Sequence, residues 1–490
     1  MTRFLVVAGA DELLTAPDLL REYLAAFGEA DDATLIIGAE DVPEAAARLG
    51  PLVPDGGADL LLVPADGLPR PAGARAALTT GTAEGLLCFG PGEAPALRAL
   101  YESGPRRGVL IVVENFLPSV GGVERIAEGL GLYLAGRGFD VGVVAYPHPG
   151  REGRDHRGLT VHELPRTDEI AALDRIVAET GVEAVIGLEA YPTAIPTLAT
   201  LLLQRSGVRR IVKPCVNEDA YRIAVERPGF LGPYAQLLAG ADGFAVSSLA
   251  GWDARLAAEL GVHASYIPNA GAEAEPTAAF RAERGIEPDV PLLLVVANLW
   301  PEKNHLGLLE AMRTEPGDWR LVLVGGDAPV HPELAGRIRE EAARDPRVVL
   351  AGPAGPGEVA AAMEAADLLL LPSKAEATPL VLVEAMSRRL PWLATPTCGS
   401  APDLSGGLIV PVERFPGAVT RLLADREERA ALAAAGREHW QACYTWDEVG
   451  ARYLALIDGA DPGGPSPAPA AAAAVTRAAR ARHEPGRLAA

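Results

Sequence analysis

The chain has 490 residues, enough for two or three domains of ordinary size. Apolar residues make up 49% of it and charged residues 22%, a composition typical of a folded globular protein. The formal net charge is -21, so the chain as a whole repels nucleic acids and anionic membrane surfaces, and we expect no nucleic-acid partner.

Cysteine usage and the first residues indicate a cellular compartment. The cysteines are scattered, with no CxxC pair and no histidine at ligand spacing, which argues against structural zinc and for a reducing compartment. The start, MTRFLVVAGADELL, lacks the layout of a signal peptide because the apolar run is short and acids follow at once. No apolar stretch approaches the roughly 20 residues needed to span a bilayer. We therefore expect a cytoplasmic protein without a transmembrane segment.

Residues 1–104 read as a small α/β domain, because short apolar runs alternate with helical patterns. Strands are expected at 3–10, 33–39, 58–65 and 85–90, and helices at 16–28 and 42–50. A weak internal repeat relates residues 4–41 to residues 292–329, each reading strand, helix, acidic turn, strand. The first block is either a degenerate Rossmann-like copy of the later nucleotide-binding half or an ordinary βαβ arrangement, and the sequence leaves both open.

Residues 105–272 form a second block of the same alternating kind. It opens with the strand GVLIVV, the glycine pair Gly121–Gly122 and an amphipathic helix. Bare backbone at Gly122, at the start of a helix, suits close approach of a phosphate, although a simple tight βα turn explains the pair equally well. The block ends at ASYIPNAGAEAEP, whose Pro, Asn and Gly predict a linker.

Residues 285–444 form the third block. Lys303 follows the strand PLLLVV, at the strand end where open α/β sheets bind ligands. It could hold a phosphate there as a point charge, and the alternative is a solvated surface lysine. A helix at about 445–458 is expected to cross back onto the second block. The Pro/Ala-rich residues 459–490 are expected to be disordered.

The stretch PSKAEATPLVLVEAM places two acids around a helix start. Glu376 lies in the loop after the buried strand ADLLLLPS, and Glu384 lies within the helix among apolar neighbours. Thr378 is a suitable N-cap and Pro379 suits the first helical position. A buried acid needs a partner, which could be ligand hydroxyls or an i,i+4 salt bridge to Arg388.

Several motifs are missing from the sequence. It contains no Asp-x-Asp, no GxxxxGK[ST] loop and no GxSxG elbow. A phosphate ligand would therefore be neutralised by lysine and helix ends, and we expect no metal and no cofactor.

Taken together, FLPSVGGVERIAEG, AVSS…YIPNAG, ANLWPEKNH, VLVGGD and the stretch around Glu376 resemble a family 4 retaining glycosyltransferase. The resemblance covers about residues 108–456. It implies the GT-B architecture, with two Rossmann-like domains facing a cleft, here joined to an extra N-terminal α/β domain. It also implies transfer of a sugar, with retention, from a nucleotide-sugar (a UDP- or GDP-sugar) to a glycan, lipid or small-molecule acceptor.

The resemblance implies roles for particular residues. Lys303 and Glu376 would be catalytic, with Lys303 on the leaving diphosphate and Glu376 on hydroxyls of the donor sugar. Glu384 would bind the ribose. The other donor-binding positions implied are Gly122, Asn298, Gly352, Pro353, Ala377, Thr378, Pro379 and Leu380.

The sequence departs from the family at three places. Asn298 stands where the family usually has an arginine, and Ala-Thr-Pro follows Glu376 where the family commonly has Gly-Phe-Gly. Acceptor-side histidines are replaced, and the residues at those places are Glu189, Tyr191, Lys213, Asn217 and Glu218. Two other readings stay open: a catalytically silent GT-B protein that binds a nucleotide-sugar or scaffolds a partner, and another GT-B enzyme such as a sugar-nucleotide epimerase.

Overall fold

The structure of the chain is a computed structural model. It describes residues 4–15, 17–27, 33–39, 42–49, 59–64, 74–78, 87–89, 107–119, 121–189, 195–203, 207–218, 221–222, 225, 236–238, 240–249, 251–271, 274–277, 279–463 and 470–483.

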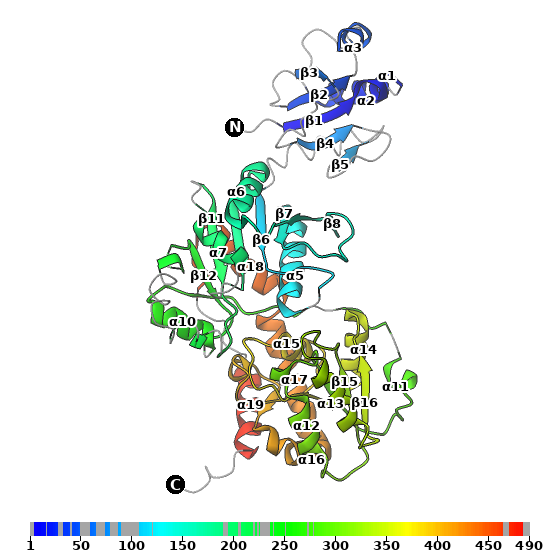
Figure 1. The fold of residues 1–490 in the computed structure, drawn as a ribbon, viewed down its shortest axis with the longest axis vertical. Helices are drawn as coiled ribbons and strands as arrows, with labels where there is room; N and C mark the ends of the chain where they lie inside the picture. The colour runs from blue at the N-terminus through cyan, green and yellow to red at the C-terminus, as the bar shows by residue number, and fades with distance from the viewer. Residues whose placement is uncertain are drawn as a thin grey trace.

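Three separate, mainly parallel sheets follow one another along the long axis of the molecule, with the first sheet at the top of Figure 1. The first has the strand order β3-β2-β1-β4-β5. Its elements are β1 (Phe4–Gly9), β2 (Ala33–Ala39), β3 (Asp59–Pro64), β4 (Ala74–Leu78), β5 (Leu87–Phe89), α1 (Ala10–Thr15), α2 (Pro17–Ala26) and α3 (Val42–Leu49). Every pairing in this sheet is parallel, which is the arrangement of a Rossmann-like domain.

The second sheet has eight strands in the order β13-β12-β11-β10-β6-β7-β9-β8. The strands are β6 (Gly108–Val112), β7 (Asp140–Ala145), β8 (Asp155–His156), β9 (Leu159–Glu163), β10 (Ala184–Leu188), β11 (Arg209–Lys213), β12 (Gly243–Val246) and β13 (Ser265–Tyr266). The helices are α5 (Gly122–Gly136), α6 (Glu169–Thr180), α7 (Ile195–Leu202) and α10 (Trp252–Leu260). The central strands read as continuous apolar runs because helices cover both faces.

The third sheet has the order β16-β15-β14-β17-β18-β19. Its strands are β14 (Leu292–Val296), β15 (Arg320–Val324), β16 (Val348–Gly352), β17 (Leu368–Leu371), β18 (Trp392–Ala394) and β19 (Gly407–Ile409). The helices are α11 (Phe280–Glu283), α12 (His305–Met312), α13 (Pro332–Ala342), α14 (Pro356–Ala365), α15 (Leu380–Ser387), α16 (Phe415–Ala424) and α17 (Arg426–Cys443). The first sheet repeats the order of the first five of these strands, but this order is general to doubly wound folds and does not decide between a diverged copy and an unrelated domain.

The chain passes twice between the second and third sheets. Residues 265–271 lead from β13 toward the third sheet, and α18 (Trp446–Ile457) returns to pack on α5 and the second sheet's core. Glycine makes this return possible: a Cβ at Gly450 would lie 2.2 Å from the Tyr133 ring, and one at Gly129 would lie 2.1 Å from the Trp446 ring. These two crossings connect the domains on either side of the candidate site.

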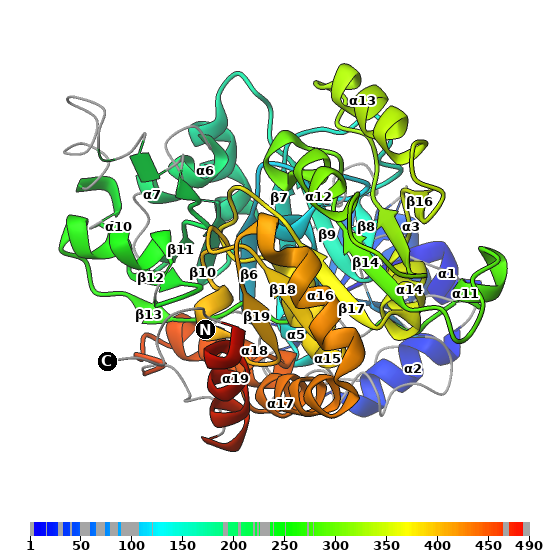
Figure 2. The ribbon, with the colours of Figure 1, turned by 90° about the horizontal axis from the view of Figure 1, so that it is seen from below.

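The prediction of a disordered tail over 459–490 is wrong for residues 470–483, which form helix α19 (Ala470–His483). In Figures 1 and 2 this helix lies beside α17, and it also contacts β19. Thr476 Oγ1 accepts from Gly406 N at 3.0 Å, and the Arg480 guanidinium donates to the carbonyls of Leu404 and Gly407 at 2.9 and 3.2 Å. Alanine is the best helix former, so tertiary contacts at a few positions are enough to fix the helix.

Arg480→Ala is expected to destabilise this domain. It leaves buried carbonyls of the 401–407 loop without their donor, and hydrogen bonds from a charged group contribute about 1.5 to 3 kcal/mol. We expect the thermal midpoint of the domain to fall by about 5 °C. Arg477→Ala, on the exposed side of the same helix, is the matched control. Equal midpoints for the two variants would show that Arg480 does not anchor α19.

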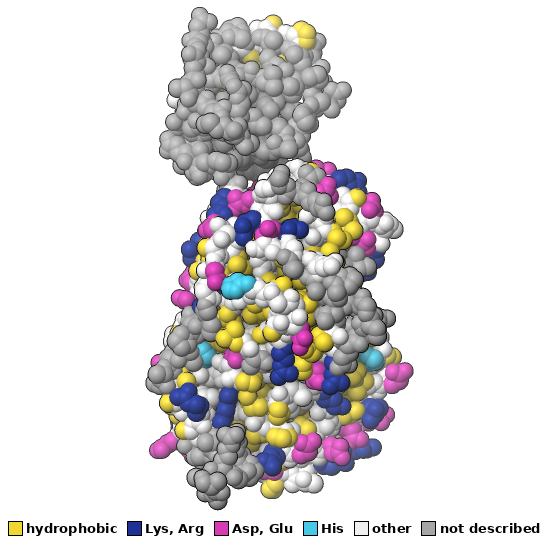
Figure 3. Space-filling model, turned by 90° about the vertical axis from the view of Figure 1, so that its left-hand side faces the viewer, with side chains coloured by type: hydrophobic (Ala, Val, Ile, Leu, Met, Phe, Trp, Pro, Cys, Tyr) yellow, Lys and Arg dark blue, Asp and Glu magenta, His cyan; other side chains and the backbone are white. Residues whose placement is uncertain are grey.

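Charge on the two larger domains is mixed. Figure 3 shows basic and acidic side chains interspersed on the described part of the face that it displays.

Within the described parts of the chain, no helix is both long and apolar enough to cross a membrane.

Candidate functional site

Lys303 and Glu376 meet at the carboxyl ends of two adjacent strands. Lys303 ends the 3₁₀ turn Pro301–Lys303 that follows β14, and Glu376 follows β17, which pairs with β14. The Lys303 Nζ lies 2.7 Å from Glu376 Oε1, and Ser373 Oγ donates to the same oxygen at 2.7 Å. Glu376 is 9% exposed, and its Oε2 makes no hydrogen bond to any residue that the structure describes. One carboxylate oxygen is therefore available to a ligand.

Hydrogen bonds between the two loops fix this pair. Asn304 adopts the left-handed conformation, with φ of 56°, which Asn tolerates better than most residues. Its Nδ2 donates to the Pro372 carbonyl at 3.1 Å, and Lys374 N donates to the Glu302 carbonyl at 2.7 Å. The backbone of Glu376 also accepts from Gly399 N, where a Cβ would lie 2.7 Å from the Ala377 carbonyl oxygen. The loop after β17 is thus held from both sides.

Glu384 lies in α15, and its carboxylate makes no hydrogen bond or ion pair within the described residues. Burial raises the pKa of Glu384, and the charges of Arg125 and Arg388 lower it in part. The i,i+4 salt bridge to Arg388 does not form, because Arg388 binds Glu364 Oε1 at 2.6 Å and also donates to the Ala274 carbonyl. A buried carboxylate of this kind lacks hydrogen-bond donors, and ribose hydroxyls could supply them.

Two helix starts approach each other here. A Cβ at Gly122, the first residue of α5, would lie 3.7 Å from Leu380 Cδ1, at the start of α15. Glycine leaves the backbone at the start of α5 uncovered, and the free N–H groups of both helices favour an anion. Glu124, in the first turn of α5, lies against Gly121, and burial raises the pKa of its carboxyl.

The prediction that Thr378 caps this helix is wrong. Helix α15 begins at Leu380 after Pro379, and no side chain caps it. The Thr378 hydroxyl instead accepts from Asn269 Nδ2, at 2.8 Å, in the segment that joins the two domains. Ala377, beside it, is partly exposed.

Asn298, Gly352 and Pro353 form a second group at the ends of β14, β15 and β16. Asn298 Oδ1 accepts from Gly326 N at 2.9 Å. A Cβ at Gly326 would lie 3.6 Å from Pro353 Cβ, so bare backbone separates these side chains. Gly352 has φ of 74°, a conformation that favours glycine. The side-chain oxygen of Asn298 therefore already accepts a hydrogen bond that joins the loops after β14 and β15.

The acceptor-side predictions are only partly placed by the structure. Glu189 follows β10 with φ of 63°, and Asn217 and Glu218 follow β11, with Glu218 bound to Arg222 at 2.8 Å. Tyr191 lies outside the described residues. The prediction for Lys213 is wrong in this structure, because its side chain is fully buried and cannot touch an acceptor. Its Nζ donates to Asn269 Oδ1 at 2.6 Å.

The structure adds residues that the sequence did not single out. Asn269, Ser247, Ser400 and Asp403 line a small pocket between the two domains, together with Pro268, Thr378, Pro379, Val383, Leu404 and Tyr444. Ser248 donates to Asp403 across the domains. The one sequence signal that included Asn269 was the YIPNAG pattern, which predicts a linker between two domains and not a binding site.

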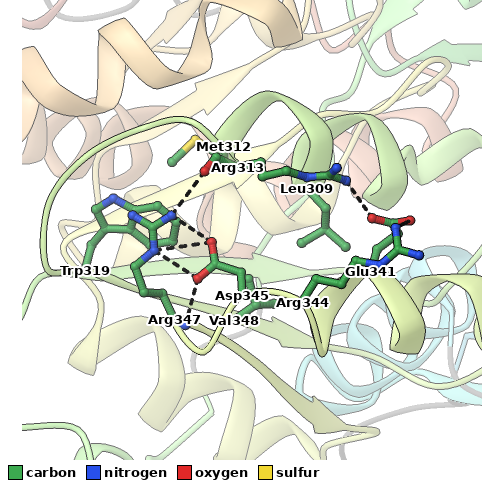
Figure 4. Close-up of a pocket in the computed structure, with 9 residues that line it drawn as sticks. All are labelled: Leu309, Met312, Arg313, Trp319, Glu341, Arg344, Asp345, Arg347 and Val348. Carbon is green, nitrogen blue, oxygen red and sulfur yellow. Dashed lines mark hydrogen bonds and ion pairs between the residues drawn. The ribbon is translucent and has the colours of Figure 1, made fainter.

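A larger pocket lies elsewhere, where Trp319 precedes β15 and Val348 begins β16 (Figure 4). The pocket lies at the amino ends of these strands, whereas Lys303 and Glu376 lie at the carboxyl ends of β14 and β17. Its arginines are occupied: Arg347 binds Asp345 at 2.7 Å and stacks on Trp319, and Arg313 binds Glu341 at 2.6 Å. We therefore place the candidate site between the domains rather than in this pocket. Within the described residues, no group of three or more His, Cys, Asp or Glu side chains could hold a metal ion.

Comparison with known sequences finds a family match for the part of the chain that forms the third sheet. Residues 277–439 match the family described as glycosyl transferases group 1. The chain is 32% identical to the D-inositol 3-phosphate glycosyltransferase of Segniliparus rotundus over 199 residues, which covers 37% of this chain and 44% of that relative. It is 25% identical over 391 residues to the GDP-mannose-dependent alpha-(1-6)-phosphatidylinositol monomannoside mannosyltransferase of Mycobacterium tuberculosis, covering 72% of this chain and 98% of that relative. The chain thus spans less than half of the first relative's length and nearly all of the second's.

Solved structures show the same architecture. Sucrose-phosphate synthase from Thermosynechococcus elongatus has a TM-score of 0.62 at 21% identity, covering 72% of this chain and 98% of that structure. Anabaena Alr3699/HepE in complex with UDP-glucose has a TM-score of 0.59 at 14% identity, covering 72% and 100%. These likenesses confirm the predicted GT-B architecture of two Rossmann-like domains. Residues 277–439 therefore resemble the group 1 glycosyl transferases, and the two larger domains have the GT-B fold.

Proposed function

We propose that the protein is a family 4 type retaining glycosyltransferase that moves a sugar from a nucleotide-sugar to an acceptor without a metal ion. The observation that carries this proposal is the Lys303–Glu376 pair at the strand ends, followed along the chain by the uncapped start of α15 and by Glu384. These elements offer an acid with one open oxygen, a cation, free helix N–H groups and an acid that lacks hydrogen-bond donors. Such groups suit the sugar, the diphosphate and the ribose of a nucleotide-sugar.

The chemistry needs charge stabilisation more than proton transfer. The bond between the anomeric carbon and the phosphate oxygen breaks, and its electron pair stays on the diphosphate. The Lys303 ammonium and the N–H groups at the starts of α5 and α15 stabilise that charge. The acceptor hydroxyl attacks from the face that the diphosphate leaves, and its proton passes to a phosphate oxygen of the donor. Configuration at the anomeric carbon is retained.

Glu376 orients the donor sugar. Because Lys303 and Ser373 both donate to Oε1, Oε2 is the oxygen that accepts from a sugar hydroxyl. The salt bridge also holds the Lys303 ammonium near the diphosphate position. Charged partners that fix one another in this way need no rearrangement during the reaction.

For donor and acceptor, the proposal is a UDP- or GDP-sugar and a hydroxyl of a glycan, lipid or small molecule. One relative is named as GDP-mannose-dependent, and one structural neighbour was solved with UDP-glucose. Several relatives are named as acting on inositol phosphate, which makes a polyol phosphate the first acceptor to test.

A thermal-shift screen with UDP-, GDP-, ADP- and dTDP-sugars, each with and without EDTA, tests the proposal. A donor present at about 100 times its Kd should add about 2.7 kcal/mol to the free energy of unfolding. We expect one nucleotide class to raise the thermal midpoint, by the same amount in EDTA. No shift with any class would contradict the proposal, and a shift abolished by EDTA would overturn metal independence. Binding without turnover for any acceptor would favour the silent binding protein.

A further inference from the structure

Lys213 is buried, and no carboxylate among the described residues accepts a hydrogen bond from its ammonium. Its side chain is fully buried at the end of β11, and the Nζ donates to Asn269 Oδ1 at 2.6 Å and to the Pro268 carbonyl at 3.4 Å. The Tyr453 ring lies 5.8 Å from the Nζ. Burial lowers the pKa of Lys213 to about 8, and the neighbouring Cys215 and Asp253 act in the opposite direction. A buried ammonium costs stability, so an apolar residue would serve the core better.

The ammonium determines which way the Asn269 amide points. A lysine ammonium only donates, so the Asn269 atom next to it is the carbonyl oxygen. The amide nitrogen is then turned toward the other domain, where it donates to Thr378 Oγ1 at 2.8 Å and to the Thr378 carbonyl at 3.4 Å. Asn269 is itself 5% exposed, so water does not compete for these bonds.

The Thr378 hydroxyl is in turn left with one proton to donate. Its oxygen accepts from Asn269, and the hydroxyl donates to no residue that the structure describes. Thr378 is partly exposed and lines the pocket between the domains, two residues before α15 begins. A donor at this place, beside the free N–H groups of a helix start, is suited to an anionic oxygen.

We propose that Lys213 is a positioning residue for the donor site: through Asn269 it fixes the Thr378 hydroxyl as a donor to the diphosphate of the nucleotide-sugar. The inference rests on the proposed function for the identity of the ligand, but the relay itself exists without a ligand. It carries a constraint from the core of one domain to the loop after Glu376 in the other. The linker segment is close enough to do so, because a Cβ at Gly271 would lie 3.1 Å from Val383 Cγ1.

A double-mutant cycle between Lys213→Met and Thr378→Val tests the relay, with UDP and GDP as probes in calorimetric titrations. Each single variant should weaken binding by about tenfold, as loss of one hydrogen bond to a charged group does. The double variant should also lose about tenfold, not a hundredfold, because both substitutions break the same path. Thr378→Ser, which keeps the hydroxyl, should restore binding, and Arg175→Met, an exposed cation on α6, should leave it unchanged.

Hydrogen exchange on the ligand-free protein separates this inference from the proposed function. In Lys213→Met, amides of residues 376–386 should exchange about tenfold faster, while those of β6 and β7 should not change. Asn269→Leu, which breaks the relay at its middle residue and leaves Lys213 itself in place, should give the same local effect. Unchanged exchange in both variants, or multiplicative losses of binding in the double variant, would overturn the role of Lys213. Absence of any nucleotide binding by the wild type would overturn the proposed function, while the exchange result would still decide the relay.

Discussion

Lys303→Met is expected to reduce the rate of sugar transfer by about 100- to 1000-fold. The substitution removes the lysine that pairs with Glu376 at the carboxyl ends of β14 and β17 while keeping a side chain of similar length. Two effects combine: the leaving diphosphate loses its nearest cation, and Glu376 loses the partner that fixes its carboxylate. The rate is measured as release of nucleoside diphosphate from the donor that the thermal-shift screen identifies.

Lys374→Met is the matched control for this prediction. Lys374 lies in the loop after β17, two residues before Glu376, and its side chain is exposed. We expect its rate to stay within about twofold of the wild type, as for other surface substitutions away from special features. Equal losses in the two variants would mean that only the overall positive charge near Glu376 matters, and that Lys303 has no particular role in departure of the diphosphate.

Glu384→Gln is expected to weaken nucleotide binding while stabilising the ligand-free protein. A carboxylate that accepts from ribose hydroxyls contributes about 1.5 to 3 kcal/mol per bond, so Kd should rise by about 10- to 100-fold. The folded-state pKa of Glu384 is raised by burial. Such a carboxyl costs the fold free energy as the pH rises from its unfolded value through the folded pKa, and the neutral amide removes that cost.

Calorimetric titration with UDP and GDP, and thermal unfolding at pH 7, check these two effects. Glu340→Gln, an exposed acid on α13, serves as the control and should change neither quantity. Unchanged nucleotide affinity in Glu384→Gln would show that this residue does not bind the ribose. Reduced stability of the ligand-free variant would instead indicate a structural role for the carboxylate.

Those parts of the fold that depend on local pattern could be predicted from the sequence. Apolar, β-branched runs such as those of β14 and β17 specify buried strands, and adjacent parallel strands bring the loops after them together. The meeting of Lys303 and Glu376, 73 positions apart, follows from this rule. Strand β4, with the sequence ARAAL, was missed because alanine has little strand propensity and the strand is fixed by pairing with β1 and β5.

Contacts between distant segments could not be predicted. Asn269 and Thr378 are 109 positions apart and lie in different blocks, so no spacing rule joins them. The Thr378 hydroxyl was therefore predicted to cap its own helix. Helix α19 was missed because an Ala-rich run after a Pro-rich one has the composition of a disordered tail, and only its contacts through Thr476 and Arg480 show that it is folded.

The most direct test of the account is a crystal structure of the protein with a nucleoside diphosphate bound. We predict that the ribose hydroxyls lie within hydrogen-bond distance of the Glu384 carboxylate, with the diphosphate at Lys303 and the starts of α5 and α15. The Thr378 hydroxyl should contact a phosphate oxygen. A nucleotide bound elsewhere, for instance in the pocket formed by Trp319 and Arg347, would contradict the proposed site and the mechanism derived from it.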